Sequence, residues 1–295
     1  MGTPLEYNNR MRTLDVEQLA AHRARTFNLP PHAPIASPAQ ALRYVNERGF
    51  IFFWPIKGIV YPSLWTAVAG DRPVPNAHDD PGHVTWRWKD EALGKRQWYY
   101  AKVLRGKATL ISLEAAPYFY ALSENYGSPE EDYLIAYQEG RMTQAARQVY
   151  EAILENGPLH TIDLRRLAHL ANARDSEFNR ALETLQKDFK ILPVGVAEAG
   201  AWHYAFIYEC VARYYPELPE QARGIPESQA RERLLDWAFA SLGASTQRDL
   251  NKLFGWGPEL TARVLARAIE RGALIEALHP SLPGTWYALP GIAGV

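Results

Sequence analysis

Basic and aromatic side chains alternate within one stretch of the chain, residues 84–107. Its seven basic residues are opposed only by Asp90 and Glu91, so its formal charge is 7 − 2 = +5. Lysine and arginine bind phosphate groups, and aromatic rings can stack on unpaired bases. The pattern therefore predicts contact with a nucleic-acid backbone. The predicted contact residues are Arg87, Lys89, Lys95, Arg96, Lys102, Arg105 and Lys107.

The tryptophans of the same stretch have two interpretations. Trp86, Trp88 and Trp98 are interleaved with the charges, as base-stacking rings would be. Trp86 and Trp88 also alternate as on a β-strand, which predicts that at least one face is buried. We therefore expect the tryptophans to belong mainly to the core, and Lys95 and Arg96 to contact phosphate.

Other motifs that carry chemistry are weak or missing. The loop at His78, Asp79, Asp80 and His83 has potential metal ligands, but without a second cluster it is more typical of a polar loop. The sequence has no phosphate-cradling Gly-Lys-Ser/Thr motif, no Gly-x-Ser-x-Gly elbow and no Cys-x-x-Cys pair. We expect no metal and no cofactor.

Composition narrows the class of protein further. The 295 residues are 47% hydrophobic and carry a net charge of −1, which argues against a uniformly basic surface but permits a local basic face. The one cysteine, Cys210, favours a reducing compartment, and no apolar run is long enough to span a membrane. We expect a cytoplasmic protein that does not bind membranes. Because no heptad pattern is sustained, we also expect a monomer.

Two segments of the second half, 143–208 and 226–289, have the same pattern of helix, short helix, longer helix and β-hairpin. This is the order of a winged helix-turn-helix, a fold that commonly binds DNA. The expected fold class is mainly α with small β-hairpin wings (α+β), in tandem winged helix-turn-helix domains. The expected divisions are an N-terminal arm and linker at 1–37, an irregular first winged-helix unit at 38–138, a second winged helix at 139–210 and a third at 226–291.

The third helix of each unit supplies further candidate contacts with double-stranded DNA. Arg180 is at an outward position of one such helix. Arg263, Arg267 and Arg271 recur every four residues, which places them on one stripe of the next. The stripe is equally compatible with a solvated face paired with Glu259 and Glu270 of the same helix.

The chain resembles the winged-helix family of bacterial alkylation-repair DNA glycosylases, the AlkZ and YcaQ type. The resemblance rests on the helix and glycine of ALRYVNERG (41–49), on Pro55, on Leu64-Trp65 and on the tandem units, and it extends over residues 38–290. It implies three tandem winged helices, of which residues 38–138 form the least regular.

The resemblance also implies a catalytic motif, Gln-apolar-Gln or Gln-apolar-Asp, between this glycine and this proline. The matching positions are Phe52, Phe53 and Trp54, so both polar positions are aromatic. Neither Phe52 nor Trp54 can accept a proton from water or stabilise an oxocarbenium ion. Both rings are candidates for the wall of a pocket that holds an unstacked base, or for a wedge inserted into the base stack.

Three hypotheses follow. The first is a DNA-binding relative of the glycosylases, linked to repair, that lacks their base-excision chemistry; its partner would be double-stranded DNA, damaged or undamaged. The second is an active glycosylase that uses other carboxylates, with Asp80, Asp90 and Glu91 as candidates. The third is a transcriptional regulator or protein-docking scaffold. Whether the chain is an enzyme stays open at this stage.

Overall fold

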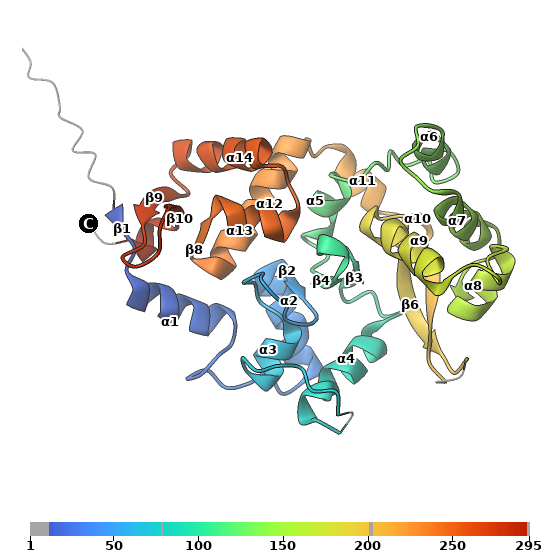
Figure 1. Cartoon of the computed structure of the whole chain (residues 1–295), viewed down its shortest axis with the longest axis horizontal. Helices are drawn as coiled ribbons and strands as arrows, with labels where there is room; N and C mark the ends of the chain where they lie inside the picture. The colour runs from blue at the N-terminus through green and yellow to red at the C-terminus, as the bar shows by residue number, and fades with distance from the viewer. Residues whose placement is uncertain (1–11, 78, 201–202, 294–295) are drawn as a thin grey trace, which may run out of the picture.

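The structure is a computed structural model of the chain, and it describes residues 12–77, 79–200 and 203–293. Helices and short strands alternate along an elongated molecule (Figure 1). Within the described residues, no helix combines the length and the apolar character that crossing a membrane requires.

Three units of the chain have the same order of elements: a helix, a strand, two helices and two strands. We refer to residues 38–111, 144–210 and 227–288 as the first, second and third units. In each unit the first strand pairs with the last, giving the sheet orders β2-β4-β3, β5-β7-β6 and β8-β10-β9.

The first unit consists of α2 (Pro38–Arg48), β2 (Phe50–Phe52), α3 (Leu64–Ala69), α4 (Val84–Ala92), β3 (Tyr99–Lys102) and β4 (Ala108–Ile111). The helix α2 begins at the Ser37 N-cap and ends at Gly49, whose φ of 74° suits glycine. The predicted alternation of Trp86 and Trp88 on a strand is wrong, because both lie on α4. The buried residues Thr85, Trp88, Lys89 and Ala92 have the spacing of one helical face.

The second unit consists of α7 (Gln144–Asn156), β5 (Leu159–His160), α8 (Thr161–Leu167), α9 (Asp175–Lys187), β6 (Ile191–Ala197) and β7 (Ala205–Cys210). It follows the predicted order of three helices and a hairpin, with β5 added. Its own core contains Val149, Leu164 and Leu185, one from each helix. The short helices α5 (Ala116–Tyr120) and α6 (Asp132–Gln138) precede it.

The third unit consists of α12 (Glu227–Leu242), β8 (Ala244–Thr246), α13 (Gln247–Phe254), α14 (Pro258–Glu270), β9 (Ile275–Leu278) and β10 (Thr285–Ala288). The N-cap of α13 is Thr246. Ser245 belongs to β8, and the Thr246 side chain accepts the Asp249 amide hydrogen at 3.2 Å. Helices α10 (Val211–Tyr214) and α11 (Leu218–Arg223) connect the second unit to the third.

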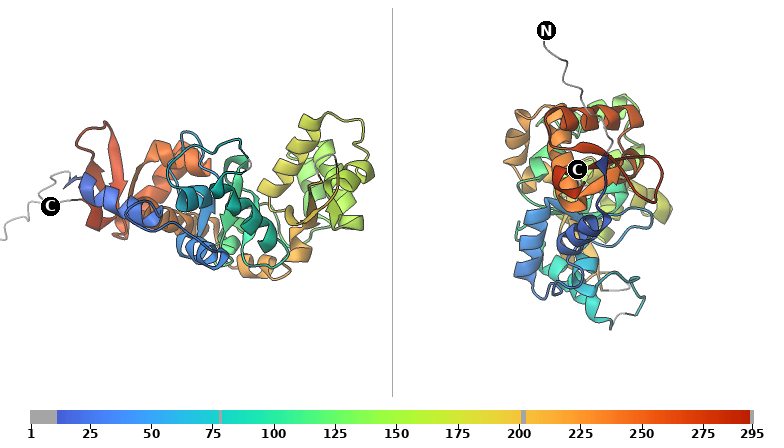
Figure 2. Two further views of the ribbon diagram at one scale, coloured as in Figure 1. Left: turned by 90° about the horizontal axis from the view of Figure 1, so that it is seen from below. Right: turned by 90° about the vertical axis from the view of Figure 1, so that its left-hand side faces the viewer.

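The first unit lies between the other two along the molecule, so the order in space differs from the order in sequence (Figures 1 and 2). The largest buried cluster joins Phe50 and Phe52 of β2 to Leu234 and Phe239 of α12 and to Leu250 of α13. The first and third units therefore share one hydrophobic core.

Residues 12–37, the described part of the N-terminal arm, pack against the third unit. The strand β1 (Arg12–Thr13) pairs in parallel with β9, and helix α1 (Val16–Thr26) packs against α12. Arg23 donates hydrogen bonds to the carbonyls of Leu242 and Ala244, at 3.0 and 2.8 Å. The arm thus adds a fourth strand to the sheet of the third unit.

Candidate functional site

The aromatic positions that match the glycosylase motif lie at and just beyond the end of β2. Phe52 and Phe53 are 1% and 2% exposed and point to opposite faces, as neighbours on a strand do. Phe52 packs edge-on against Tyr61 in the core shared with the third unit, with ring centroids 6.2 Å apart. The prediction that Phe52 lines a base pocket is therefore wrong, because its ring is enclosed by core residues. Trp54 is only half-buried.

Trp54 belongs to a cluster of rings that continues to the surface. Its ring centroid lies 5.3 Å from that of Trp65, 5.9 Å from that of His83 and 5.9 Å from that of Trp86. Trp86 is 40% exposed, whereas Trp88 and Trp98 are buried in the core. Two of the three tryptophans of the basic stretch are thus core residues, and Trp86 is partly at the surface.

Lys89 lies beneath this cluster and does not face solvent. Its Nζ atom is 4.5–5.8 Å from the centroids of the rings of Phe53, Trp86, Tyr100, Tyr204 and Phe206. The side chain is 2% exposed. The prediction that Lys89 contacts phosphate is therefore wrong, because its helical position turns the side chain inward.

A polar network satisfies the buried amine. The Lys89 Nζ donates to the Tyr204 hydroxyl at 2.9 Å and lies 2.7 Å from Asp90 Oδ1. The Tyr204 hydroxyl accepts from Trp86 Nε1 at 3.2 Å and donates to Asp90 Oδ1 at 2.9 Å. Burial lowers the pKa of the Lys89 amine, and the hydrogen bond to Asp90 opposes that shift. Since Tyr204 directly precedes β7, the network joins the first unit to the second.

The three candidate carboxylates do not converge on one site. Asp80 accepts two hydrogen bonds from Arg72, at 2.6 and 2.9 Å, and one from the Gly82 amide at 2.8 Å. The bonds from Arg72 lower the pKa of Asp80, which does not suit a general acid.

Asp90 and Glu91 are neighbours on α4 but have different surroundings. Asp90 is held in the network of Lys89 and Tyr204. Glu91 is exposed and lies 3.6 Å from Arg87 Nε, so its charge is partly balanced by a surface ion pair.

The predicted basic residues lie in several places. Lys95, Lys102, Lys107, Arg180 and Arg263 are exposed. The guanidinium of Arg96, also on an exposed residue, lies 4.8 Å from the ring centroid of Tyr214 and 5.7 Å from that of Tyr215, against the connector helix α10.

The arginine stripe of α14 is held by a neighbouring helix. Arg267 pairs with Glu232 at 3.1 Å and Arg271 pairs with Asp236, both acidic residues of α12. Glu259 and Glu270 of α14 are not these partners. The expected pairing of the stripe with glutamates of the same helix is therefore wrong for Arg267 and Arg271. Ion pairing with α12 leaves these two arginines less available to phosphate than an unpaired stripe would be.

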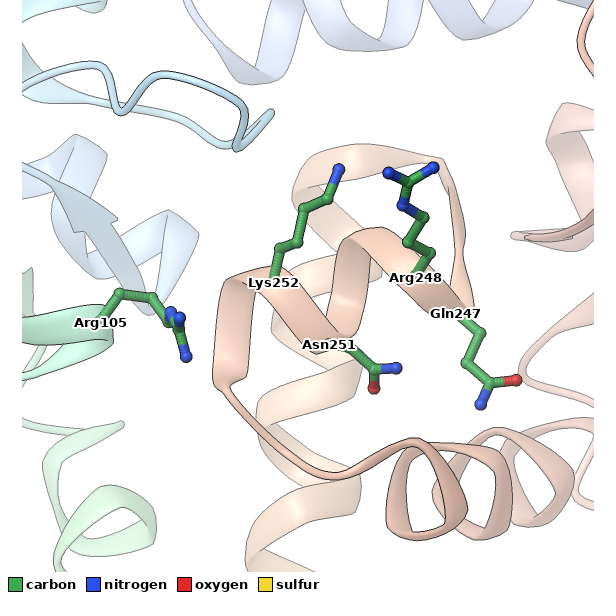
Figure 3. Close-up of a pocket in the computed structure, with 5 residues that line it drawn as sticks. All are labelled: Arg105, Gln247, Arg248, Asn251 and Lys252. Atoms are coloured by element: carbon green, nitrogen blue, oxygen red, sulfur yellow. The ribbon is translucent and has the colours of Figure 1, made fainter.

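The structure brings Arg105 together with residues that the sequence had not suggested. An open concavity of about 580 Å³ is lined by Arg105, from the short turn at Leu104–Gly106, and by Gln247, Arg248, Asn251 and Lys252 of α13 (Figure 3). Arg248 and Lys252 are one helical turn apart, which is a signal that the QRDLNK segment does carry. Their closeness to Arg105 depends on tertiary packing and has no sequence signal.

No group of three His, Cys, Asp or Glu residues within the described ranges is placed to hold a metal ion. Asp80 is engaged by Arg72, and His78 of the same loop lies outside the described residues.

Comparison with known proteins places this arrangement of units in a class. The fold is similar to that of a solved structure, Streptomyces sahachiroi DNA glycosylase AlkZ, with a TM-score of 0.57 and 13% sequence identity over 95% of this chain and 71% of that chain. The fold is therefore that of an AlkZ-like protein. The sequence pattern of the family described as AlkZ related matches residues 35–255, and the chain belongs to that family. A comparison with curated protein sequences gave no match.

Proposed function

We propose that this chain is a winged-helix protein that binds double-stranded DNA, is linked to DNA repair, and lacks base-excision chemistry at the positions of the glycosylase motif. Membership of the AlkZ-related family supports the link to repair, since the structurally similar AlkZ is named a DNA glycosylase. Similarity of fold does not carry the chemistry with it, so the chemistry is argued from the residues.

The three units support the winged-helix assignment. Each has a helix, a strand, two helices and two strands, and in each the first strand pairs with the last. In this interpretation the hairpins β3–β4, β6–β7 and β9–β10 are the wings. The helix pairs α3–α4, α8–α9 and α13–α14 are the helix-turn-helix elements that contact DNA in such proteins.

The proposal that base-excision chemistry is missing rests mainly on Phe52. A glycosidase needs an acid, base or nucleophile beside the departing sugar. Phe52 offers only a hydrocarbon ring, which is 1% exposed, and Trp54 offers only an indole N–H. Asp80 and Asp90 are already engaged by Arg72, Lys89 and Tyr204.

The test is binding of the purified protein to labelled duplexes, undamaged or alkylated, over a series of salt concentrations, followed by hot alkali. We expect binding that weakens with salt and no strand breaks at the lesion. Breaks at the lesion would overturn the non-catalytic part of the proposal, and Asn substitutions at Asp80 and Asp90 and Gln at Glu91 would then identify the acid. No binding at low salt would overturn the DNA-binding part and favour a docking scaffold.

A variant tests the basic stretch directly. Replacing both Lys95 and Arg96 with alanine should lower affinity and flatten the salt dependence by about two units, since each phosphate contact contributes about 0.9. An unchanged slope would remove this segment from the interface. Arg96 also contacts Tyr214 and Tyr215, so its substitution removes a contact within the protein as well as a charge.

A further inference from the structure

We propose that the concavity between the turn at Leu104–Gly106 and helix α13 binds the phosphate backbone of DNA, and that α13, rather than the arginine stripe of α14, is the main contact helix of the third unit. This inference rests on the proposed function and names the side chains that perform it.

Three cations line the concavity, and they come from two segments distant in sequence. Arg105 belongs to the wing side of the first unit, whereas Arg248 and Lys252 belong to α13 of the third. Figure 3 shows Arg248 and Lys252 extending from α13 in the same direction, with Arg105 reaching toward the helix from the other segment. Two anions lie nearby. Asp249 is 3.0 Å from Lys252 Nζ, and Glu183 of α9 lies against Gly106, next to Arg105, so the local charge is 3 − 2 = +1.

The backbone at Arg105 is held in an unusual conformation. Its φ is +56°, in the left-handed region that residues other than glycine rarely adopt. Such strain persists only where the surroundings impose it, and it is concentrated at functional sites. Here the conformation brings the guanidinium over Gly255, where a Cβ atom would lie 2.9 Å from Arg105 Nη1. The glycine at the end of α13 therefore leaves room for the arginine.

The remaining lining groups are polar and are not fully used within the protein. Asn251 Oδ1 is buried and has no hydrogen-bond partner among the described residues. A half-turn of the side-chain amide would place its N–H donors where this oxygen lies. Buried polar atoms are normally bonded to protein or water, so this amide is suited to a ligand or to the water that accompanies one.

The shape and chemistry favour a phosphodiester chain. Arginine binds phosphate oxygens through two parallel N–H groups. Arg248 and Lys252 are separated by one helical turn, about 5 Å along the axis, and Arg105 adds a third cation beyond the end of α13. A row of cations over an open surface suits a linear polyanion. Lys252 also has an acidic partner, Asp249 of the same helix, whereas Arg267 and Arg271 are paired with acids of a different helix, α12.

The test measures the affinity of single variants for a labelled undamaged duplex over a KCl series. We expect Arg105→Ala, Arg248→Ala and Lys252→Ala each to flatten the slope of log K against log [salt] by about 0.9, and Arg267→Ala to leave it unchanged. The control is Arg223→Ala on α11, which removes an exposed arginine that is paired with Glu220 and lies outside the concavity.

Each outcome has a defined meaning. If wild-type protein does not bind duplex DNA, the proposed function fails. If wild-type protein binds but the three variants behave like Arg223→Ala, or if Arg267→Ala alone flattens the slope, this inference fails and the proposed function stands. Inorganic phosphate, at matched ionic strength, should displace DNA no better than chloride. Stronger displacement by phosphate would identify a small-anion site instead and overturn the inference.

Discussion

Replacing Gly49 with alanine should destabilise the protein through the contact between its first and third units. Gly49 ends α2 with a φ of 74°, and a Cβ atom there would lie 2.7 Å from the indole ring of Trp237 on α12. Real Cβ atoms do not approach that closely, so the indole or the helix must move. Trp237 is 8% exposed and packs against Tyr118, which restricts that movement.

The magnitude has two parts. Forcing alanine into this backbone conformation costs about 1–3 kcal/mol, and overpacking a filled core costs about 1–3 kcal/mol more. The expected loss in the free energy of unfolding is therefore about 2–6 kcal/mol. Gly58 is the control, since its φ is 78° and no atom lies within 4 Å of its added Cβ. Gly58→Ala should lower the free energy of unfolding by about 1–3 kcal/mol, from strain alone.

The assay is urea unfolding, completed by a double-mutant cycle with Trp237→Leu. Trimming the indole relieves the overpacking but not the backbone strain, so the two changes should couple by about 1–3 kcal/mol. Two results would refute the reasoning: equal losses for Gly49→Ala and Gly58→Ala, or additive losses in the cycle. Either would mean that the end of α2 does not press on α12.

Three buried polar groups give further predictions. The Tyr99 hydroxyl is buried without a partner among the described residues, so Tyr99→Phe should raise the free energy of unfolding by about 1 kcal/mol. The Tyr215 hydroxyl donates to the Trp98 carbonyl at 3.1 Å, so Tyr215→Phe should lower the free energy of unfolding by about 1–2 kcal/mol. Urea titrations that rank the two variants in the opposite order would contradict this assignment. Lys89→Ala should lower the free energy of unfolding by about 2–4 kcal/mol because it empties the space between the rings, and Lys89→Met should restore most of that loss. A methionine variant as unstable as the alanine variant would show that the ion pair with Asp90 is essential. Burial lowers the pKa of Lys89 in the folded state below the ordinary 10.5, so between these two pKa values the unfolded chain binds more protons than the folded one. The stability of the wild type relative to Lys89→Met should therefore rise as the pH increases through that window. A flat or falling difference in pH-dependent unfolding would be inconsistent with this burial.

Local sequence signals were sufficient for the second and third units. The apolar spacing of α7, α9, α12 and α14, and the glycine after α13, are readable because each element repeats its pattern over several turns. The same spacing rule failed at α4. Two tryptophans two residues apart would share one face of a strand but not of a helix, and in the structure Trp86 is 40% exposed whereas Trp88 is buried.

The candidate site was less predictable for a physical reason. Arg105 could be proposed from charge, but its neighbours Arg248 and Lys252 lie more than 140 positions further along the chain. Their proximity results from the core shared by the first and third units. Lys89 is the opposite case. Its charge predicted a role at the surface, but its position on the buried face of α4 excludes that role.

The arrangement of the units also bears on how the chain is made. A ribosome releases the arm and the first unit early, yet the surfaces they cover, on α12, α13 and β9, are synthesised last. Until then Phe50 and Phe52 of β2 lack the residues of α12 and α13 that later cover them, and β1 lacks β9, the strand with which it pairs. The shared core therefore has a high contact order, which slows folding and leaves apolar surface open to aggregation or to chaperones. The second unit, with a core of its own, is the segment best suited to fold while synthesis continues.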